Sequence, residues 1–208
     1  MLCHREQAVL PQALAKLGKK LKSPALATRC GAFLRLSYGE TQDIQHKEQA
    51  GMRQHSVIHT PKPSDYQELT QVWEASVRAT HDFLPDSYIE LLKNLVLTRY
   101  LDAVMLICTR DARQRITGFA GVAAGKVEML FIDPQHRGQG LGKQLLRYAM
   151  EHLNADQLDV NEQNPQALGF YLKQGFEVVG RSAKDGMNQP YPLLHMRYKQ
   201  PDLKAGRG

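Results

Sequence analysis

Three alternating glycines separate an apolar run from an amphipathic stretch, and this arrangement constrains the fold more than any other feature. Gly138, Gly140 and Gly142 lie between the apolar run at residues 126–132 and a helical apolar periodicity that extends to about residue 153. The pattern predicts a strand, a turn and a helix. Glycine has no Cβ, so the turn can approach a ligand closely while amides at the helix start point at one place. The sequence therefore predicts a cradle for an anion such as a diphosphate.

The glycine spacing excludes two familiar phosphate-binding loops. A dinucleotide loop needs Gly-x-Gly-x-x-Gly, and a nucleoside triphosphate loop needs Gly-x-x-x-x-Gly-Lys followed by Ser or Thr. Here the glycines alternate, and neither Ser nor Thr directly follows Lys143. The hydroxyl that would bind Mg²⁺ in a triphosphate loop is therefore missing.

Two ordered motifs resemble the GNAT superfamily of N-acetyltransferases. The first, Q-x-x-G-x-G at residues 135–140, follows an apolar run that ends in Asp-Pro and is similar to the acetyl-coenzyme A (acetyl-CoA) motif of that family. The second, N-E-Q-N-P-Q-A-L-G-F-Y-L-K-Q-G-F at residues 161–176, is similar to the later Asn…Phe-Tyr…Gly-Phe segment. Residues 79–84 and 190–194 also resemble small bacterial members of the YjaB type. The resemblance covers roughly residues 57–198.

The order of predicted elements indicates an α+β, or mixed α/β, layer fold. The resemblance implies the acyl-CoA N-acyltransferase fold, with a mostly antiparallel twisted sheet of about six or seven strands and about four flanking helices. A capping box at Ser64 and Gln67 predicts the first helix start. The other helices are predicted over residues 86–100, from the glycine turn to 153, and from Asn164 to Gly175. Strands are predicted at residues 56–60, 103–109, 116–123, 126–132, 158–160, 176–181 and 193–199.

Length and composition indicate one domain with extensions. We assign residues 52–200 to the N-acetyltransferase domain, residues 1–51 to a weakly ordered or peripheral extension, and residues 201–208 to a tail. The extension contains no motif that we can interpret. An alternative is that Met52 is the biological start and that the preceding residues come from an over-long reading frame.

Charge, cysteine usage and hydropathy favour a cytoplasmic protein without nucleic-acid or membrane partners. The 208 residues carry a formal net charge of +6, with Lys and Arg spread along the chain, as on an ordinary basic surface. No apolar run approaches the roughly 18 residues of a membrane span. Cys3, Cys30 and Cys108 are widely separated and have no metal-ligand spacing, so we expect no metal.

The resemblance implies that acetyl-CoA is the cosubstrate and that the main chain makes most of its contacts. The strand would bind the pantetheine arm as an added strand does, and the turn would bind the diphosphate through amides. Asn161 and Asn164 match amide positions that hold the cofactor, although Asn164 is equally a helix N-cap. The implied cofactor-binding residues are Leu130, Phe131, Ile132, Arg137, Gly138, Gln139, Gly140, Leu141, Gly142, Lys143, Asn161 and Asn164.

Acetyl transfer also needs a proton donor for the departing thiolate and an unprotonated amine. Tyr171 occupies the family's Phe-Tyr position near the coenzyme A sulfur, and a phenol with a pKa near 10 keeps its proton at neutral pH. Its alternative is a buried tyrosine that only packs. Glu128 lies where relatives carry a carboxylate base, but strand alternation leaves a surface position equally open, and solvent is another proton acceptor.

The resemblance implies that the connection between the first two helices of the domain lines the acceptor side. His81, Asp82 and Phe83 interrupt the helical pattern there. If they reach the site, His81 would orient or deprotonate the amine and Asp82 would attract its positive charge, whereas Phe83 is more typical of packing than of substrate recognition. A simple capping turn is the alternative. The acceptor can be a small molecule or a peptide, and the sequence does not specify the oligomeric state.

The expected function is direct transfer of an acetyl group from acetyl-CoA to a primary amine, without an acyl-enzyme. Cys108 is a possible nucleophile, but its apolar strand is typical of an inert buried thiol. A non-catalytic acyl-CoA sensor on the same fold is the alternative function, and the presence of Tyr171 favours catalysis.

Overall fold

The computed structural model describes residues 57–199. The predictions for the extension at residues 1–51, the start at Met52 and the tail at residues 201–208 lie outside the described residues.

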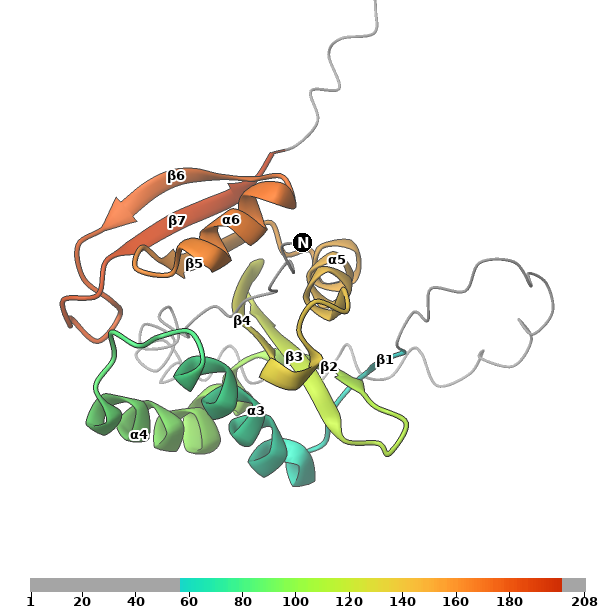
Figure 1. The fold of residues 1–208 in the computed structure, drawn as a ribbon. Coiled ribbons are helices and arrows are strands. Elements are labelled where there is room, and N and C mark those ends of the chain that lie inside the picture. Colours follow the sequence, from blue (N-terminus) through green and yellow to red (C-terminus); the bar gives the residue numbers. More distant parts are fainter. Residues whose placement is uncertain (1–56, 200–208) are drawn as a thin grey trace, which may run out of the picture.

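A seven-stranded sheet forms the centre of the described region (Figure 1). Its order is β1-β2-β3-β4-β5-β7-β6, and every neighbouring pair is antiparallel except the parallel pair β4 and β5. This mostly antiparallel sheet confirms the predicted fold class. The strands are β1 (Ile58–His59), β2 (Met105–Arg110), β3 (Ile116–Ala123), β4 (Lys126–Ile132), β5 (Gln157–Asn161), β6 (Phe176–Ser182) and β7 (Leu193–Tyr198).

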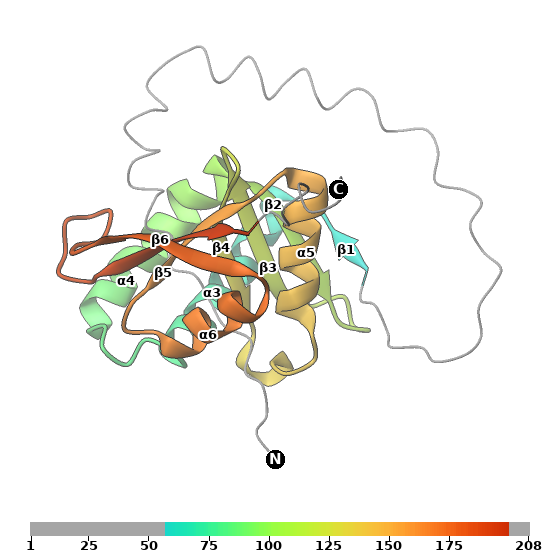
Figure 2. The same cartoon turned by 90° about the horizontal axis from the view of Figure 1, so that it is seen from above.

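Four α-helices within the described residues cover the two faces of the sheet (Figure 2). The first pair lies on one face and the second pair on the other, so the molecule has three layers. The helices are α3 (Tyr66–Arg78), α4 (Asp86–Leu95), α5 (Leu141–Leu153) and α6 (Pro165–Lys173). Short helical turns are η1 (Pro63–Asp65), η2 (Val96–Tyr100), η3 (Leu101–Ala103) and η4 (Pro134–His136).

Strand β4 contributes to both cores because its side chains alternate between the faces. Met129 and Phe131 point toward α3, where Phe131 meets the fully buried Trp73 with ring centroids 6.3 Å apart. Leu130 and Ile132 point into the other core beneath α5 and α6. The strand is therefore fixed from both sides, and its backbone is a rigid base for a site.

The sheet opens between β4 and β5, and this opening is the feature of the fold that matters most for function. The two strands pair only through Lys126 with Gln157 and Val127 with Leu158. Beyond these pairs β4 continues beside β3, whereas β5 continues beside β7. Figure 1 shows β5, β7 and β6 turning away from the rest of the sheet. We call the space between the diverging strands the wedge, and the paired end its apex.

Three local predictions were wrong at the level of individual residues. The capping box does not use Ser64 and Gln67, because Pro63 starts a 3₁₀ turn in which the Asp65 carboxylate accepts a 2.8 Å hydrogen bond from the Lys62 amide. Of the strand predicted at residues 56–60, the described part beginning at residue 57 forms a strand over Ile58–His59. The helix predicted to residue 100 changes to a π-helical turn after Leu95.

Candidate active site

The glycine turn after β4 has the conformation that its sequence predicts. Gly138 and Gly140 have φ angles of 78° and 85°, a region that costs other residues about 1–2 kcal/mol. Gly140 is the N-cap of α5, so the first turn of a 13-residue helix begins directly after it. Amides at such a helix start have no carbonyl of their own helix to bind, and the helix dipole is positive there. The geometry is that of an anion cradle.

Side chains around the cradle anchor it and add positive charge. Asp133 accepts a 2.8 Å hydrogen bond from the Gln135 amide, which fixes the turn at its start. The Arg137 guanidinium donates to the hydroxyl of Ser76 at 3.0 Å and so ties the turn to α3. Lys143 and Arg147 line a cavity of about 660 Å³ along α5. Glu151 and Asp156 line the same cavity farther along, so its positive charge lies at Lys143 and Arg147, beside the cradle.

Tyr171 is completely buried in the core beneath α6. Its ring lies in the same cluster as Leu130 of β4 and Val160 of β5, the two strands that form the wedge. The Phe176 ring meets it edge-on at 6.0 Å. Its hydroxyl has no hydrogen-bond partner among the described residues, and burial raises the pKa of the phenol well above its usual value near 10. Tyr171 is thus a neutral phenol with an unused donor.

Asn161, the last residue of β5, and Asn164, the N-cap of α6, each have an unused side-chain donor. The Asn164 side-chain oxygen accepts a 3.0 Å hydrogen bond from the Ala167 amide, which confirms the predicted N-cap. The Asn161 oxygen accepts from the Gln163 amide at 2.8 Å. Both Nδ2 groups are buried without a partner among the described residues. Because buried donors are normally satisfied, these groups and the Tyr171 hydroxyl fit a polar ligand in the wedge.

Glu128 is buried at the apex of the wedge and is not a surface charge. Gly121 pairs with Met129 and Val122 pairs with Val127, so Glu128 is the extra residue of a β-bulge. Its residue exposure is only 5%, and burial raises the pKa of its carboxyl to about 7. The nearby Asp159 raises this pKa further, whereas Lys126 lowers it. A carboxyl with such a pKa can accept or release a proton near neutrality.

The predicted acceptor residues lie in the connection between α3 and α4. His81 is buried, and burial lowers the pKa of its imidazole to about 4, so it is a neutral and weak base. Phe83 packs between His81 and Tyr191 of the β6–β7 loop, with centroid distances of 5.3 and 6.0 Å. Asp82 is exposed. These contacts favour a packing role for the segment and make His81 a poor candidate for deprotonating an amine.

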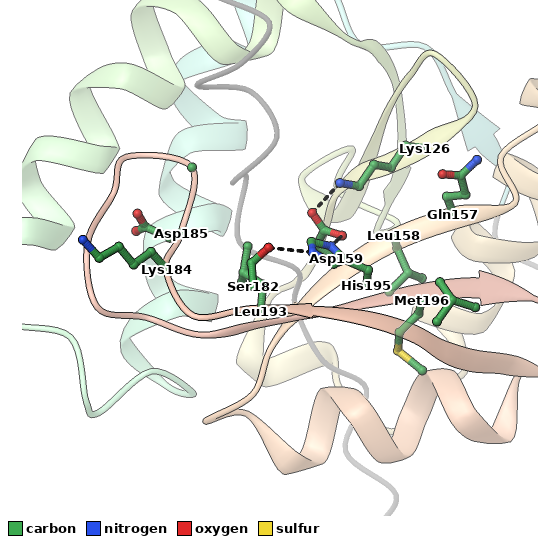
Figure 3. Close-up of a pocket in the computed structure, with 12 residues that line it drawn as sticks. Lys126, Gln157, Leu158, Asp159, Ser182, Lys184, Asp185, Leu193, His195 and Met196 are labelled. Atoms are coloured by element: carbon green, nitrogen blue, oxygen red, sulfur yellow. Dashed lines mark hydrogen bonds and ion pairs between the residues drawn. The ribbon is translucent and has the colours of Figure 1, made fainter.

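A polar network beside the apex was missed by the sequence analysis. Asp159 of β5 accepts from Lys126 Nζ at 2.5 Å and lies 2.6 Å from His195 Nδ1 on β7. The other ring nitrogen, Nε2, lies 2.7 Å from Ser182 Oγ on β6. These residues line a cavity of about 240 Å³. Figure 3 shows them around it. The sequence signal was a polar residue between two apolar neighbours in each of two strands, Asp159 in L-D-V and His195 in L-H-M.

Three further observations concern chemistry elsewhere in the described region. Cys108 is fully buried, and burial raises the pKa of its thiol to about 11, so it is protonated and shielded. Within residues 57–199, no cluster of His, Cys, Asp or Glu side chains is arranged to hold a metal ion. No helix in this region is long and apolar enough to cross a membrane.

Together, the opened sheet, the glycine cradle and the unused donors define an acyltransferase of the acyl-CoA N-acyltransferase fold. A family model described as an acetyltransferase (GNAT) domain matches residues 85–198. The chain belongs to this GNAT family of acetyltransferases, as its motifs predicted.

Individual relatives agree with the family assignment. The peptidyl-lysine N-acetyltransferase YjaB of Salmonella typhimurium is 40% identical over 141 residues, which are 68% of this chain and 97% of the relative. YjaB of Escherichia coli is 39% identical over 68% of this chain and 95% of its own length. The solution structure of apo YjaB from Escherichia coli superposes with a TM-score of 0.64 at 38% identity, covering 70% of this chain and 98% of that protein.

A more distant solved structure shows the same fold with a ligand. The PaiA N-acetyltransferase of Thermoplasma acidophilum, solved in complex with coenzyme A, has a TM-score of 0.52 and 22% identity. The superposition covers 68% of this chain and 98% of that protein. At this identity the similarity concerns the fold.

Proposed function

We propose that this chain transfers the acetyl group of acetyl-CoA directly to a primary amine, and that the amine is a lysine side chain of a protein. The wedge carries this proposal, because it places a neutral buried phenol and a buried carboxyl of raised pKa along one opening in the sheet. The peptidyl-lysine activity named for the two YjaB relatives supports the choice of acceptor.

The residues that would hold acetyl-CoA are those predicted from the motifs. The segment Leu130, Phe131 and Ile132 borders the wedge, where β4 lacks a strand neighbour, so alternate residues turn their backbone groups toward it. Asn161 and Asn164 would donate their unused amide hydrogens, and the cradle would bind the diphosphate. When bound there, acetyl-CoA supplies an activated thioester carbonyl. The cradle residues are Arg137, Gly138, Gln139, Gly140, Leu141, Gly142 and Lys143.

Two side chains would move protons. Tyr171 donates its phenolic proton to the sulfur that leaves, because burial without a charged partner keeps it protonated over the working pH range. Glu128 accepts a proton from the acceptor ammonium, since its carboxyl titrates near pH 7. Cys108 has no part in this route, because its thiol is buried and protonated.

The test is acetyl transfer by the full chain to peptides that differ only in their amines. One peptide carries a lysine and a blocked α-amine, and its partner carries a free α-amine and no lysine. We expect thiol release and a mass increase of one acetyl group on the lysine peptide. Tight binding of acetyl-CoA without turnover on any amine, including small polyamines, would instead favour the sensor.

A further inference from the structure

The hydrogen-bond chain beside the apex has a definite direction. An ionised carboxylate only accepts hydrogen bonds, so the contact with Asp159 places the His195 proton on Nδ1. In the neutral imidazole the other ring nitrogen, Nε2, is then an acceptor for the Ser182 hydroxyl hydrogen. This is the order of groups in a Ser-His-Asp triad, in which the imidazole withdraws a proton from the hydroxyl.

Three strands contribute residues to this hydrogen-bond network, and the His195 ring is in contact on several sides. Asp159, Ser182 and His195 come from β5, β6 and β7, and Figure 3 shows them converging in the cavity. Gly180 lies opposite His195 in the β6–β7 pairing, and a Cβ there would be only 3.3 Å from His195 Cδ2. The absence of a side chain at residue 180 leaves room for the ring.

The position of this hydrogen-bond network in the fold links it to the proposed reaction. Asp159 directly follows Leu158, the last residue of β5 that pairs with β4, so it lies at the apex of the wedge. Glu128, the candidate base, is close enough for Asp159 to raise the pKa of its carboxyl. The cavity lined by Lys126, Ser182 and His195 therefore adjoins the place where the proposed transfer occurs.

The proton balance of acetyl transfer leaves room for a second proton acceptor, and this hydrogen-bond network can fill that role. Conversion of an ammonium into an amide removes two protons from the nitrogen, forms the C–N bond and breaks the C–S bond. The departing thiolate takes up one proton, so one proton leaves for solvent. The Glu128 carboxyl accepts only one proton at a time. A second acceptor would take the second proton that the nitrogen loses.

We propose that Ser182, His195 and Asp159 form a proton relay for the acceptor amine, a proposal that rests on the proposed function. Ser182 Oγ accepts a proton from the amine nitrogen and passes its own hydroxyl proton to His195 Nε2. Asp159 stabilises the imidazolium through Nδ1–H. The His195 side chain is 35% exposed, so the ring can then release the proton to solvent.

The charged groups near the His195 ring influence the pH dependence that a kinetic experiment on the relay would measure. From β4, Lys126 lines the same cavity and Glu128 interacts with Asp159, and from β5 Asp159 contacts the ring directly. The β6–β7 loop contributes Lys184 and Asp185 to the same cavity. The Asp185 carboxylate is already engaged by the Tyr88 hydroxyl at 2.6 Å and by two loop amides. Asp159 is therefore the carboxylate in direct contact with the imidazole.

The first experiment measures the relay without acetyl-CoA. Ring-nitrogen NMR of His195 in the full chain should show the neutral imidazole protonated on Nδ1, and Asp159→Asn should shift the proton toward Nε2. A wild-type ring protonated on Nε2 would overturn the relay. This measurement does not depend on the proposed function, so it decides the hydrogen-bond chain even if no amine is acetylated.

The second experiment measures kcat for the lysine peptide against pH. We expect His195→Gln and Ser182→Ala each to lower kcat about 10²-fold near pH 7.5 with little change in the KM for acetyl-CoA. The residual rate should rise about tenfold per pH unit, because hydroxide then replaces the relay as the acceptor of the second proton. His152→Gln, on the exposed end of α5, is the matched control and should behave as wild type.

Two outcomes of the kinetic experiment would overturn the relay. One is a wild-type kcat and pH profile in Ser182→Ala, which removes one half-buried hydroxyl and so serves even where the histidine variant does not fold. The other is an acetyl group found on Ser182 by mass spectrometry, which would make the hydroxyl a nucleophile. A wild-type enzyme that binds acetyl-CoA but acetylates no lysine would contradict the proposed function instead.

Discussion

Glu128 and Asp159 are each the first residue after the last pair that joins β4 to β5. The bulge turns Glu128 out of the regular register, and both residues are buried at the apex of the wedge. Two acidic groups in one desolvated place interact, and the charge of Asp159 accordingly raises the Glu128 pKa. Divergence of the strands therefore creates both the opening and its acid–base chemistry.

Replacing Glu128 should change the pH dependence of catalysis. Its carboxyl has a pKa of about 7, so the fraction in the basic form rises through neutral pH. We expect Glu128→Gln to lower kcat by about 10²-fold and to remove the limb of the profile near pH 7. Glu177→Gln, at an exposed position on β6, is the control. An unchanged limb in Glu128→Gln would assign it to another group.

The same substitution should stabilise the fold at neutral and higher pH. The pKa of Glu128 is higher in the folded state than its ordinary value of 4.5, so the folded state binds more protons between pH 4.5 and about 7. Stability therefore falls as pH rises through this window. We expect Glu128→Gln to raise the free energy of unfolding by roughly 1–3 kcal/mol above pH 7 and to have little effect below pH 4. Urea unfolding at several pH values measures this.

Removing the phenolic hydroxyl of Tyr171 should separate chemistry from binding. Tyr171→Phe keeps the ring packed against Phe176 and deletes only the unused donor, so the fold should persist. We expect kcat to fall by about 10²-fold or more while acetyl-CoA affinity stays nearly unchanged. Calorimetry and steady-state kinetics test this, with Tyr148→Phe on α5 as the control. A kcat equal to wild type would remove Tyr171 from the reaction.

Local patterns predicted the cradle well because short-range physics determines it. The alternating glycines, the apolar run before them and the helical spacing after them all act within about one turn of chain. Gly138 and Gly140 accordingly have positive φ, and α5 ends at Leu153 as expected. Asn164 likewise caps α6 through the Ala167 amide. Family motifs supplied the remaining step from this turn to acetyl-CoA.

Features that depend on strand pairing could not be predicted in the same way. The burial of Glu128 follows from a bulge against β3, and no local pattern distinguished it from an exposed position. Asp159, Ser182 and His195 belong to three strands whose order in the sheet, β5-β7-β6, is not their order in the chain. Their side chains meet only because the sheet places these strands side by side.

His81 should make the protein less stable in mild acid. Burial lowers its folded-state pKa from 6.5 to about 4, so between these values the unfolded state binds more protons. Its contribution is therefore present above pH 6.5 and is lost as pH falls toward 4. His81→Gln should weaken this acid dependence by roughly 1–3 kcal/mol between pH 6.5 and 4. Unfolding free energies that fall equally in the variant and wild type would contradict this.

A charge placed at the cradle should weaken cofactor binding more than a change of shape does. Gly140 has a φ of 85° at the N-cap of α5, a conformation that Asn and Asp tolerate better than other side chains. Gly140→Asn and Gly140→Asp add nearly the same volume, so their difference isolates one negative charge beside the diphosphate. We expect calorimetry to show weaker acetyl-CoA binding in both, with the Asp variant about tenfold weaker than Asn and the gap narrowing at high salt. Equal affinities at low salt would place the diphosphate elsewhere.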